Sequence, residues 1–271
     1  MERVASGYGL AEAPVAAPGG GVYFSDVLGG GVYYFSATTG EVETVVAKRR
    51  GVGGMALHAD GGLVMTGRDV VHVREGQSRT LYANQNIPGL NDMTVDPDGH
   101  VIVGCLRFRP LAGEPPVAGE FIRLDGTVVL CDVLWPNGCA FSPDGLTFYG
   151  CDYQRGVVLA ADRISDGQYG ATRIAVVSPS ATADGMAVDE DGCLWVALGA
   201  RASVGRFTPD GNLDAEIPVD ADFVASLCFA GVDRRDLFIT TAGNPADPEA
   251  RGGVFVTRAP VAGLVVPAVT D

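Results

Sequence analysis

Six stretches of 15 residues can be aligned along this chain without a gap, and this repeat constrains the fold more than any other feature of the sequence. Successive stretches begin between 38 and 47 residues apart and run through the whole chain. A repeat of this period is typical of an architecture in which each repeat forms one four-stranded blade of a β-propeller. The six blocks are EAPVAAPGGGVYFSD (12–26), GGMALHADGGLVMTG (53–67), NDMTVDPDGHVIVGC (91–105), NGCAFSPDGLTFYGC (137–151), DGMAVDEDGCLWVAL (184–198) and SLCFAGVDRRDLFIT (226–240).

The order of residues inside the blocks predicts a β-hairpin in each of them. The twelfth position is always apolar or aromatic and has apolar neighbours, which is typical of a buried strand. Turn sequences such as DPDG and SPDG precede this run, and their glycine suits the positive φ of a hairpin. Segments 30–46, 119–133 and 202–219 supply outer strands.

We therefore predict an all-β fold, a six-bladed β-propeller with four antiparallel strands per blade, formed by residues 1–271 as a single domain. A β-sandwich with a similar number of strands is the alternative, but it does not explain six equal blocks.

Composition and charge narrow the class of protein. The chain has 271 residues, 47% of them apolar, with 38 glycines and 16 prolines, as expected for many tight turns between short strands. Its net charge of −14 argues against nucleic acid and anionic membranes as partners and weakly favours cation binding. No apolar stretch reaches the roughly 20 residues of a membrane span, and no secretion signal is apparent. The six cysteines form no C-x-x-C pair, so we expect free thiols and a cytoplasmic location.

The first position of the blocks carries the residues with the clearest chemistry. It precedes the predicted innermost strand, and in a radial repeat equivalent positions lie on a ring around the axis. Four of the six side chains are carboxylates or carboxamides, and burying them without a cation would leave two like charges and several polar groups unpaired. The six residues are Glu12, Gly53, Asn91, Asn137, Asp184 and Ser226.

One divalent cation would satisfy these oxygens together. Oxygen ligands without nitrogen or sulfur favour Ca²⁺, with Mg²⁺, Mn²⁺ and an open Zn²⁺ site as alternatives. The competing interpretation is a turn role, since Asn, Asp and Gly are common before strands. Recurrence in one column of the repeat favours the metal site.

The three histidines do not contribute to this column. His58 and His100 fall in predicted hairpin turns, and His72 falls in an outer strand. A histidine-based zinc site or a Ser-His-Asp triad is therefore not expected. DPDGH also begins like a calcium-binding EF-hand loop, but no closing Glu follows at the required spacing, so a hairpin turn is predicted there.

Four of the polar segments also resemble a known family. LAEAP, LNDMTVDPDG, PNGCAFSPDG and ADGMAVDEDG are similar to segments of the senescence marker protein (regucalcin), gluconolactonase and luciferin-regenerating enzyme-like family. The resemblance implies a six-bladed propeller in which Glu12, Asn91, Asn137 and Asp184 hold a divalent cation. It also implies metal-dependent hydrolysis of lactones, although relatives hydrolyse phosphorus esters or have other roles.

The expected mechanism uses water activated by the cation. Asp184, a ligand with a second carboxylate oxygen, is the expected general base, as the resemblance also suggests. Asp92 is a candidate for orienting water or substrate, with a plain turn role as the alternative. Trp135 stands two residues before Asn137 and is either a packing residue or a substrate contact.

The resemblance weakens in two places. The family often has an arginine two residues before the Asn-Asp pair to contact substrate, and here Gly89 stands there, so a less polar or differently shaped substrate is plausible. The long segment 106–120 is a candidate lid. From it, Arg107 or Arg109 would meet a substrate carboxylate, or else remain solvated loop charges.

Three functions follow as hypotheses. The first is a metal-dependent lactonase. The others are a propeller enzyme that uses the same cation for phosphotriester hydrolysis or hydration, and a non-catalytic propeller that binds a metal or a partner.

Overall fold

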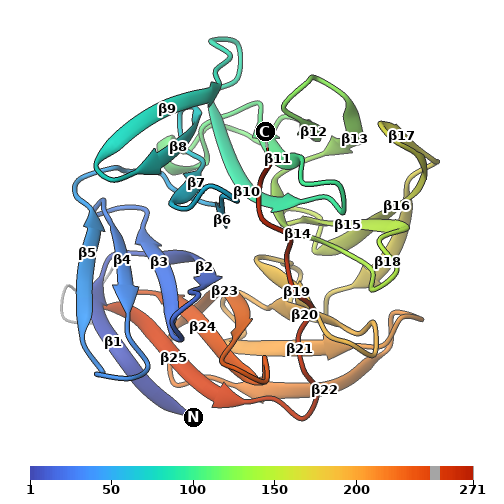
Figure 1. The fold of residues 1–271 in the computed structure, drawn as a ribbon. Coiled ribbons are helices and arrows are strands. Elements are labelled where there is room, and N and C mark those ends of the chain that lie inside the picture. Colours follow the sequence, from blue (N-terminus) through green and yellow to red (C-terminus); the bar gives the residue numbers. More distant parts are fainter. Residues whose placement is uncertain (245–250, 271) are drawn as a thin grey trace. The chain divides into compact units, whose positions relative to one another are not determined.

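The computed structural model describes residues 1–244 and 251–270, which form six antiparallel sheets in chain order (Figure 1). The predicted all-β fold, a six-bladed β-propeller with four antiparallel strands per blade, is confirmed. The chain divides into two compact units of three blades each. The expectation of a single domain over residues 1–271 stays a prediction. No helix in the described residues is long and apolar enough to cross a membrane.

The first unit comprises Met1–Val52 and Asp184–Leu264 and contains blades one, five and six. In blade six the N-terminal strand β1 pairs with β25, so the first residues of the chain complete the last sheet. The strands are β1 (Glu2–Tyr8), β2 (Ala11–Ala16), β3 (Val22–Asp26), β4 (Val32–Phe35), β5 (Val42–Val46), β19 (Met186–Val188), β20 (Leu194–Ala197), β21 (Ser203–Phe207), β22 (Leu213–Pro218), β23 (Phe223–Ala230), β24 (Asp236–Ala242) and β25 (Gly252–Arg258).

The second unit comprises Gly53–Ala183 and Val265–Asp271 and contains blades two, three and four. Blade four is the largest, because its third strand β16 pairs with both β17 and β18. The elements are β6 (Met55–Leu57), β7 (Leu63–Met65), β8 (Val70–Arg74), β9 (Gln77–Tyr82), β10 (Gly89–Val95), β11 (Val101–Leu106), the short 3₁₀ helix η1 (Pro110–Ala112), β12 (Gly119–Arg123), β13 (Val128–Val133), β14 (Pro136–Phe141), β15 (Thr147–Asp152), β16 (Val157–Ser165), β17 (Gln168–Tyr169) and β18 (Arg173–Val177).

The twelfth position of the sequence block lies in the second strand of every blade, as predicted, and is buried in five of the six. Trp195 and Phe238 belong to the core of the first unit, and Ile102 and Phe148 to that of the second. Blade one differs: Tyr23 is half-buried and lies 5.2 Å, between ring centroids, from Tyr34 on the neighbouring strand. In blade one, this position is therefore occupied by an aromatic ring that packs against a second half-exposed ring and not by a fully buried side chain.

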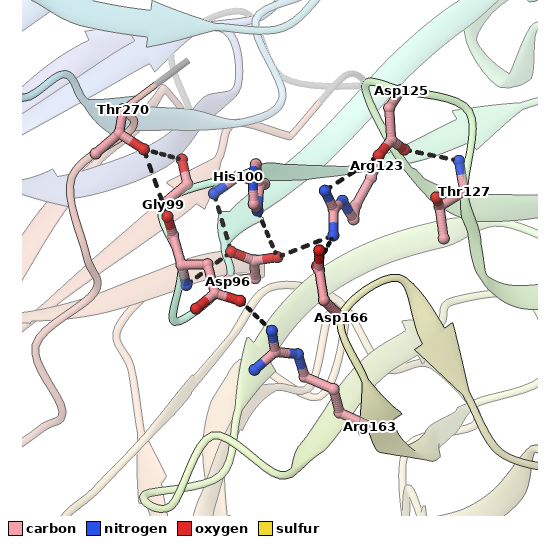
Figure 2. A network of polar contacts seen from close by, with 10 residues as sticks. Asp96, Gly99, His100, Arg123, Asp125, Thr127, Arg163, Asp166 and Thr270 are labelled. Carbon is pink, nitrogen blue, oxygen red and sulfur yellow. Dashed lines mark hydrogen bonds and ion pairs between the residues drawn. The ribbon is translucent and has the colours of Figure 1, made fainter.

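A buried aspartate stabilises the inner hairpin turn of blade three. Asp96 accepts the backbone N–H groups of Asp98 and His100, both at 2.9 Å, and its other oxygen lies 3.9 Å from Arg123 Nη1. Arg123 in turn pairs with Asp166 in the β16–β17 turn of blade four (Figure 2). The turn is therefore fixed both within its blade and to the next one.

Blade five repeats this arrangement at equivalent positions. Asp189 accepts the N–H groups of Asp191 and Cys193 at 3.0 and 2.9 Å, and Arg206 Nε donates to it at 2.8 Å. Each aspartate is sixth in its sequence block, and each arginine lies opposite the twelfth position on the third strand. In both blades the buried carboxylate is thus hydrogen-bonded by the turn backbone and paired with an arginine, which holds the turn in one conformation.

Blade two has two histidines at these same positions. His58 is sixth in its block, and His72 lies opposite the twelfth position on β8. Their rings are buried and stack at a centroid distance of 3.9 Å with 7° between the planes. His58 Nδ1 accepts the N–H of Asp60, as the aspartates do in the other turns, and His72 Nε2 lies 2.8 Å from the carbonyl oxygen of Gly61. A stacked histidine pair thus replaces the ion pair.

The C-terminal residues of the second unit pack against the hairpin turns of blades two and three. Val269 is fully buried in the core of this unit and exchanges backbone hydrogen bonds with the His58 turn, through Leu57 and Ala59. Thr270 donates its N–H to the carbonyl of Gly99. Val269 and Thr270 therefore cover the hairpin turns of these two blades.

The equivalence of the histidine and aspartate–arginine pairs predicts the outcome of a swap. His72→Arg alone should lower the free energy of unfolding by about 2 to 3 kcal/mol, because it buries a charge beside a neutral ring. Adding His58→Asp should recover most of this loss by recreating the pair of blade five. Urea unfolding of the wild type, the single and the double variant measures both values. A double variant no more stable than the single one would contradict the equivalence.

Candidate functional site

An extra residue interrupts the innermost strand of the blades at the first position of the sequence block. The register of β2 against β3 shifts by one residue between Glu12 and Val15, and β10 and β14 shift at the corresponding places. In blade five, the backbone of Ala197 accepts a hydrogen bond from Asp184 and donates one to Gly185. Two residues of the first strand segment therefore again pair with one residue of the second strand. Such β-bulges bend a strand and redirect its side chains, and they are common next to functional sites.

In the first unit the bulges carry the two predicted carboxylate ligands. Glu12 is 8% exposed and Asp184 is 5% exposed. Glu12 begins its bulge on β2, Asp184 precedes β19, and both strands contact β23. A Cβ atom on Gly185 would come within 2.1 Å of Ser226 Oγ, so only glycine allows the Asp184 segment to approach β23 this closely. This unit therefore presents two buried carboxylates on strands either side of β23.

In the second unit the bulges carry the two predicted amide ligands, on the adjacent strands β10 and β14. Asn91 Nδ2 donates to the carbonyl of Pro136 at 2.9 Å, which directs its Oδ1 toward Gly53. A Cβ atom on residue 53 would lie 2.3 Å from that oxygen, so the glycine leaves it uncovered. Asn137 is 5% exposed, and its side chain makes no hydrogen bond within the described part of the chain.

The Glu12 carboxylate fits a cation ligand. Its hydrogen bond among the described residues comes from the backbone N–H of Ala13 at 2.9 Å, and no side-chain cation pairs with it. Ala13 adopts a φ of 52°, an unfavourable conformation for a residue with a side chain, and this turns its N–H toward the carboxylate. Burial raises the pKa of Glu12 to about 7. A buried carboxylate without a cationic partner and a buried amide without a hydrogen bond are what a set of oxygen ligands requires.

The predicted substrate contacts of the second unit lie beside Asn91 and Asn137. Asp92 is buried, and together with burial its charge raises the pKa of the Cys139 thiol on β14. Trp135 is half-buried and packs between Tyr153, at a centroid distance of 4.6 Å, and Phe108, at 5.6 Å. The sequence pattern did not group Phe108 and Tyr153 with Trp135, because they follow the second strands of different blades.

Arg107 and Arg109 each have a carboxylate partner close by. Arg107 forms a two-point ion pair with Glu120 on β12, and this hydrogen bonding raises its pKa. Arg109 pairs with Glu114 at 2.9 Å, and Glu114 also accepts the Arg109 backbone N–H, which lowers the Glu114 pKa. Both charges are thus balanced inside segment 106–120.

A second group of possible metal ligands lies away from this column, in the inner turn of blade three. One ligand atom from each of Asp96, Asp98 and His100 lies within 4.8 Å of the others. The contacts of Asp96 with the turn backbone, and those of Asp98 with Arg163, account for the cluster (Figure 2). We therefore interpret it as the hairpin turn that the sequence predicts.

Comparison with known proteins identifies relatives along most of the chain. The family model of the SMP-30/gluconolactonase/LRE-like region matches residues 10–243. A 6-deoxy-6-sulfogluconolactonase of Pseudomonas putida is 30% identical over 266 residues, which cover 91% of this chain and 89% of the relative. A pentonolactonase of Haloferax volcanii is 30% identical over 246 residues, covering 86% and 81%.

Solved structures show the same fold. A luciferin-regenerating enzyme superposes with a TM-score of 0.88 at 20% identity, covering 100% of this chain and 99% of that one. A calcium-binding regucalcin of Agrobacterium tumefaciens superposes with a TM-score of 0.84 at 20% identity, covering 97% and 95%. At this identity the likeness concerns the fold alone.

The raised pKa of Glu12 predicts how pH and metal together affect stability. In chelator-treated protein the folded state holds this proton more tightly than the unfolded chain, whose pKa is near 4.5, so the free energy of unfolding falls as pH rises from 4.5 to about 7. A cation requires the ionised form, so the increase in melting temperature caused by Ca²⁺ should grow over the same interval.

Differential scanning calorimetry with and without Ca²⁺ at several pH values measures this growth. Glu12→Gln should abolish it, and Glu43→Gln, at an exposed position on β5, should leave it unchanged. A Ca²⁺ effect that is equal at pH 5 and pH 7.5 in the wild type would exclude Glu12 as a ligand.

Proposed function

Because this chain belongs to the SMP-30/gluconolactonase/LRE-like family, we propose that it is a lactonase-type hydrolase that opens a small-molecule lactone with water and depends on a divalent cation. The observation that carries the metal dependence is the Glu12 carboxylate, which is buried, has a pKa raised by that burial, and has no cationic side chain paired with it among the described residues. A scaffold protein has no need of such a group.

In this proposal the cation is held by Glu12, Asn91, Asn137 and Asp184. The set consists of oxygen donors, which favours Ca²⁺ over Mg²⁺, Mn²⁺ or Zn²⁺. The name of the Agrobacterium relative, a calcium-binding protein, supports the same choice. The bulges at Glu12, Asn91 and Asn137 and the matching one at Asp184 support a common role for the four positions.

The bound cation would polarise the lactone carbonyl and lower the pKa of a water molecule. The residues then have separate tasks. Asp184 would act as the general base: it would take the proton of the attacking water and return it to the ring oxygen as the acyl C–O bond of the lactone breaks. Asp92 orients the water or the substrate, and the exposed face of Trp135 packs against the lactone ring, supported by Phe108 and Tyr153.

The proposal also concerns location and partners. The structure describes the six cysteines as free thiols, which supports the cytoplasm as the place of action. The net charge of −14 supports a small molecule, and not nucleic acid or an anionic membrane, as the partner.

A panel of lactones assayed with and without chelator tests the proposal. Wild-type turnover of at least one lactone should fall to background with chelator and return with Ca²⁺. Asp184→Asn should reduce kcat by about 100-fold or more, since it removes the base and a negative ligand. Asp210→Asn, in an exposed outer turn of the same unit, serves as the matched control with unchanged kcat.

Circular dichroism separates loss of catalysis from loss of folding in the Asp184 variant. Retained hydrolysis by a folded Asp184→Asn protein would remove Asp184 from the mechanism. Turnover that is insensitive to chelator would remove the metal, and an inactive wild type on every lactone would reject the reaction class.

A further inference from the structure

Four arginines lie in the loops that follow the second strands of blades two, three and four, at the same strand ends as Asn91 and Asn137. Three of them are bound to carboxylates. Arg107 pairs with Glu120 and Arg109 with Glu114. Arg155 pairs with Asp152 at 2.9 Å and with Asp132 at 3.1 Å. Neighbouring carboxylates balance the charges of these three arginines, so a ligand carboxylate would have to displace an existing partner in order to bind them.

The fourth, Arg68, has a different partner. Its Nη1 donates to the backbone carbonyl of Pro88 at 3.2 Å, and no carboxylate pairs with its guanidinium among the described residues. The side chain is exposed. A carbonyl oxygen accepts one hydrogen bond but does not neutralise the charge, and a guanidinium has five N–H donors, so Arg68 retains both charge and donors for a ligand.

The backbone on either side of Arg68 fixes its place relative to Asn91. Leu90, the residue before Asn91, donates its N–H to the Gly67 carbonyl at 2.8 Å in an isolated antiparallel bridge. Arg68 therefore leaves β7 directly beside the start of the Asn91 bulge, and its guanidinium reaches across to Pro88. All these residues belong to the second unit.

Residue 89, next in sequence to the Pro88 whose carbonyl Arg68 contacts, is a glycine. Gly89 has no positive φ, so its backbone does not require glycine. A Cβ atom there would make only ordinary contact with Leu106 Cδ1, at 3.5 Å. A larger residue would fit at position 89, so the glycine leaves this side-chain position, one residue from the Pro88 carbonyl, unoccupied.

We propose that Arg68 binds a carboxylate of the ligand and makes this a site for acidic sugar lactones, those that carry an ionised carboxylate in addition to the lactone. This rests on the proposed lactonase function for the nature of the ligand. The planar guanidinium binds a carboxylate through two parallel hydrogen bonds, which explains why an arginine serves this purpose better than a lysine. Arg107 and Arg109 remain bound to their own glutamates.

Calorimetric titration of two open-chain sugar acids in the presence of Mg²⁺ tests this without relying on turnover. D-glucarate has the second carboxylate and D-gluconate lacks it. Arg68→Met should weaken glucarate binding by about tenfold or more and gluconate binding by less than about twofold. Arg68→Lys should recover part of the loss. Arg155→Met is the matched control, since it removes an arginine of a neighbouring loop, and it should leave the ratio of the two affinities unchanged.

The results separate this proposal from the proposed function. Equal affinity of the wild type for both acids, equal losses for both in Arg68→Met, or a loss that follows Arg107→Met instead would overturn the role of Arg68. None of these results bears on the chelator-sensitive hydrolysis of lactones. If no lactone is hydrolysed but the Arg68 effect is found, the lactonase function fails and the carboxylate site stands.

Discussion

The register of the innermost strands is the constraint on which the rest of this structure depends. Side chains of a regular strand alternate between its two faces. The register that buries the apolar residues therefore also fixes the face on which each polar side chain lies. One surplus residue at the start of the first strands of blades one, three and four removes this restriction locally. The strand downstream keeps its core register, and Glu12, Asn91 and Asn137 take positions that regular pairing would not allow.

The two ends of the first hairpins serve different purposes. At the turn end, a buried side chain accepts backbone N–H groups of the turn: Asp96 and Asp189 do so beside an arginine, and His58 does so beside His72. At the other end, the first strands leave a carboxylate and an amide incompletely paired, and a backbone conformation at Ala13 that is unfavourable by itself. The hydrogen-bonded turns at one end of the blades therefore offset the destabilising effect of the incompletely paired polar groups at the other end.

The repeat in the sequence predicted the blades, the inner hairpins and the outer strands at 30–46, 119–133 and 202–219, because these depend on local alternation and turn chemistry. The same repeat placed Glu12, Asn91, Asn137 and Asp184 at one equivalent position of their blocks. The partners of Arg107 and Arg109 could not be predicted, since they depend on how one loop folds back on itself. Neither could the contact of Arg68 with Pro88, which joins two blades, nor the half-buried Tyr23, whose neighbour Tyr34 is on another strand.

The burial of Val269 under the turns of blades two and three has a consequence for biosynthesis. Residues 53 to 105 leave the ribosome long before this valine is made, so their packed core lacks one of its members throughout most of translation. The same holds for blade six, whose strand β1 is made well before β25, the strand with which it pairs. Both contacts form only after the later segment has been made, and until then the earlier strands keep an exposed edge.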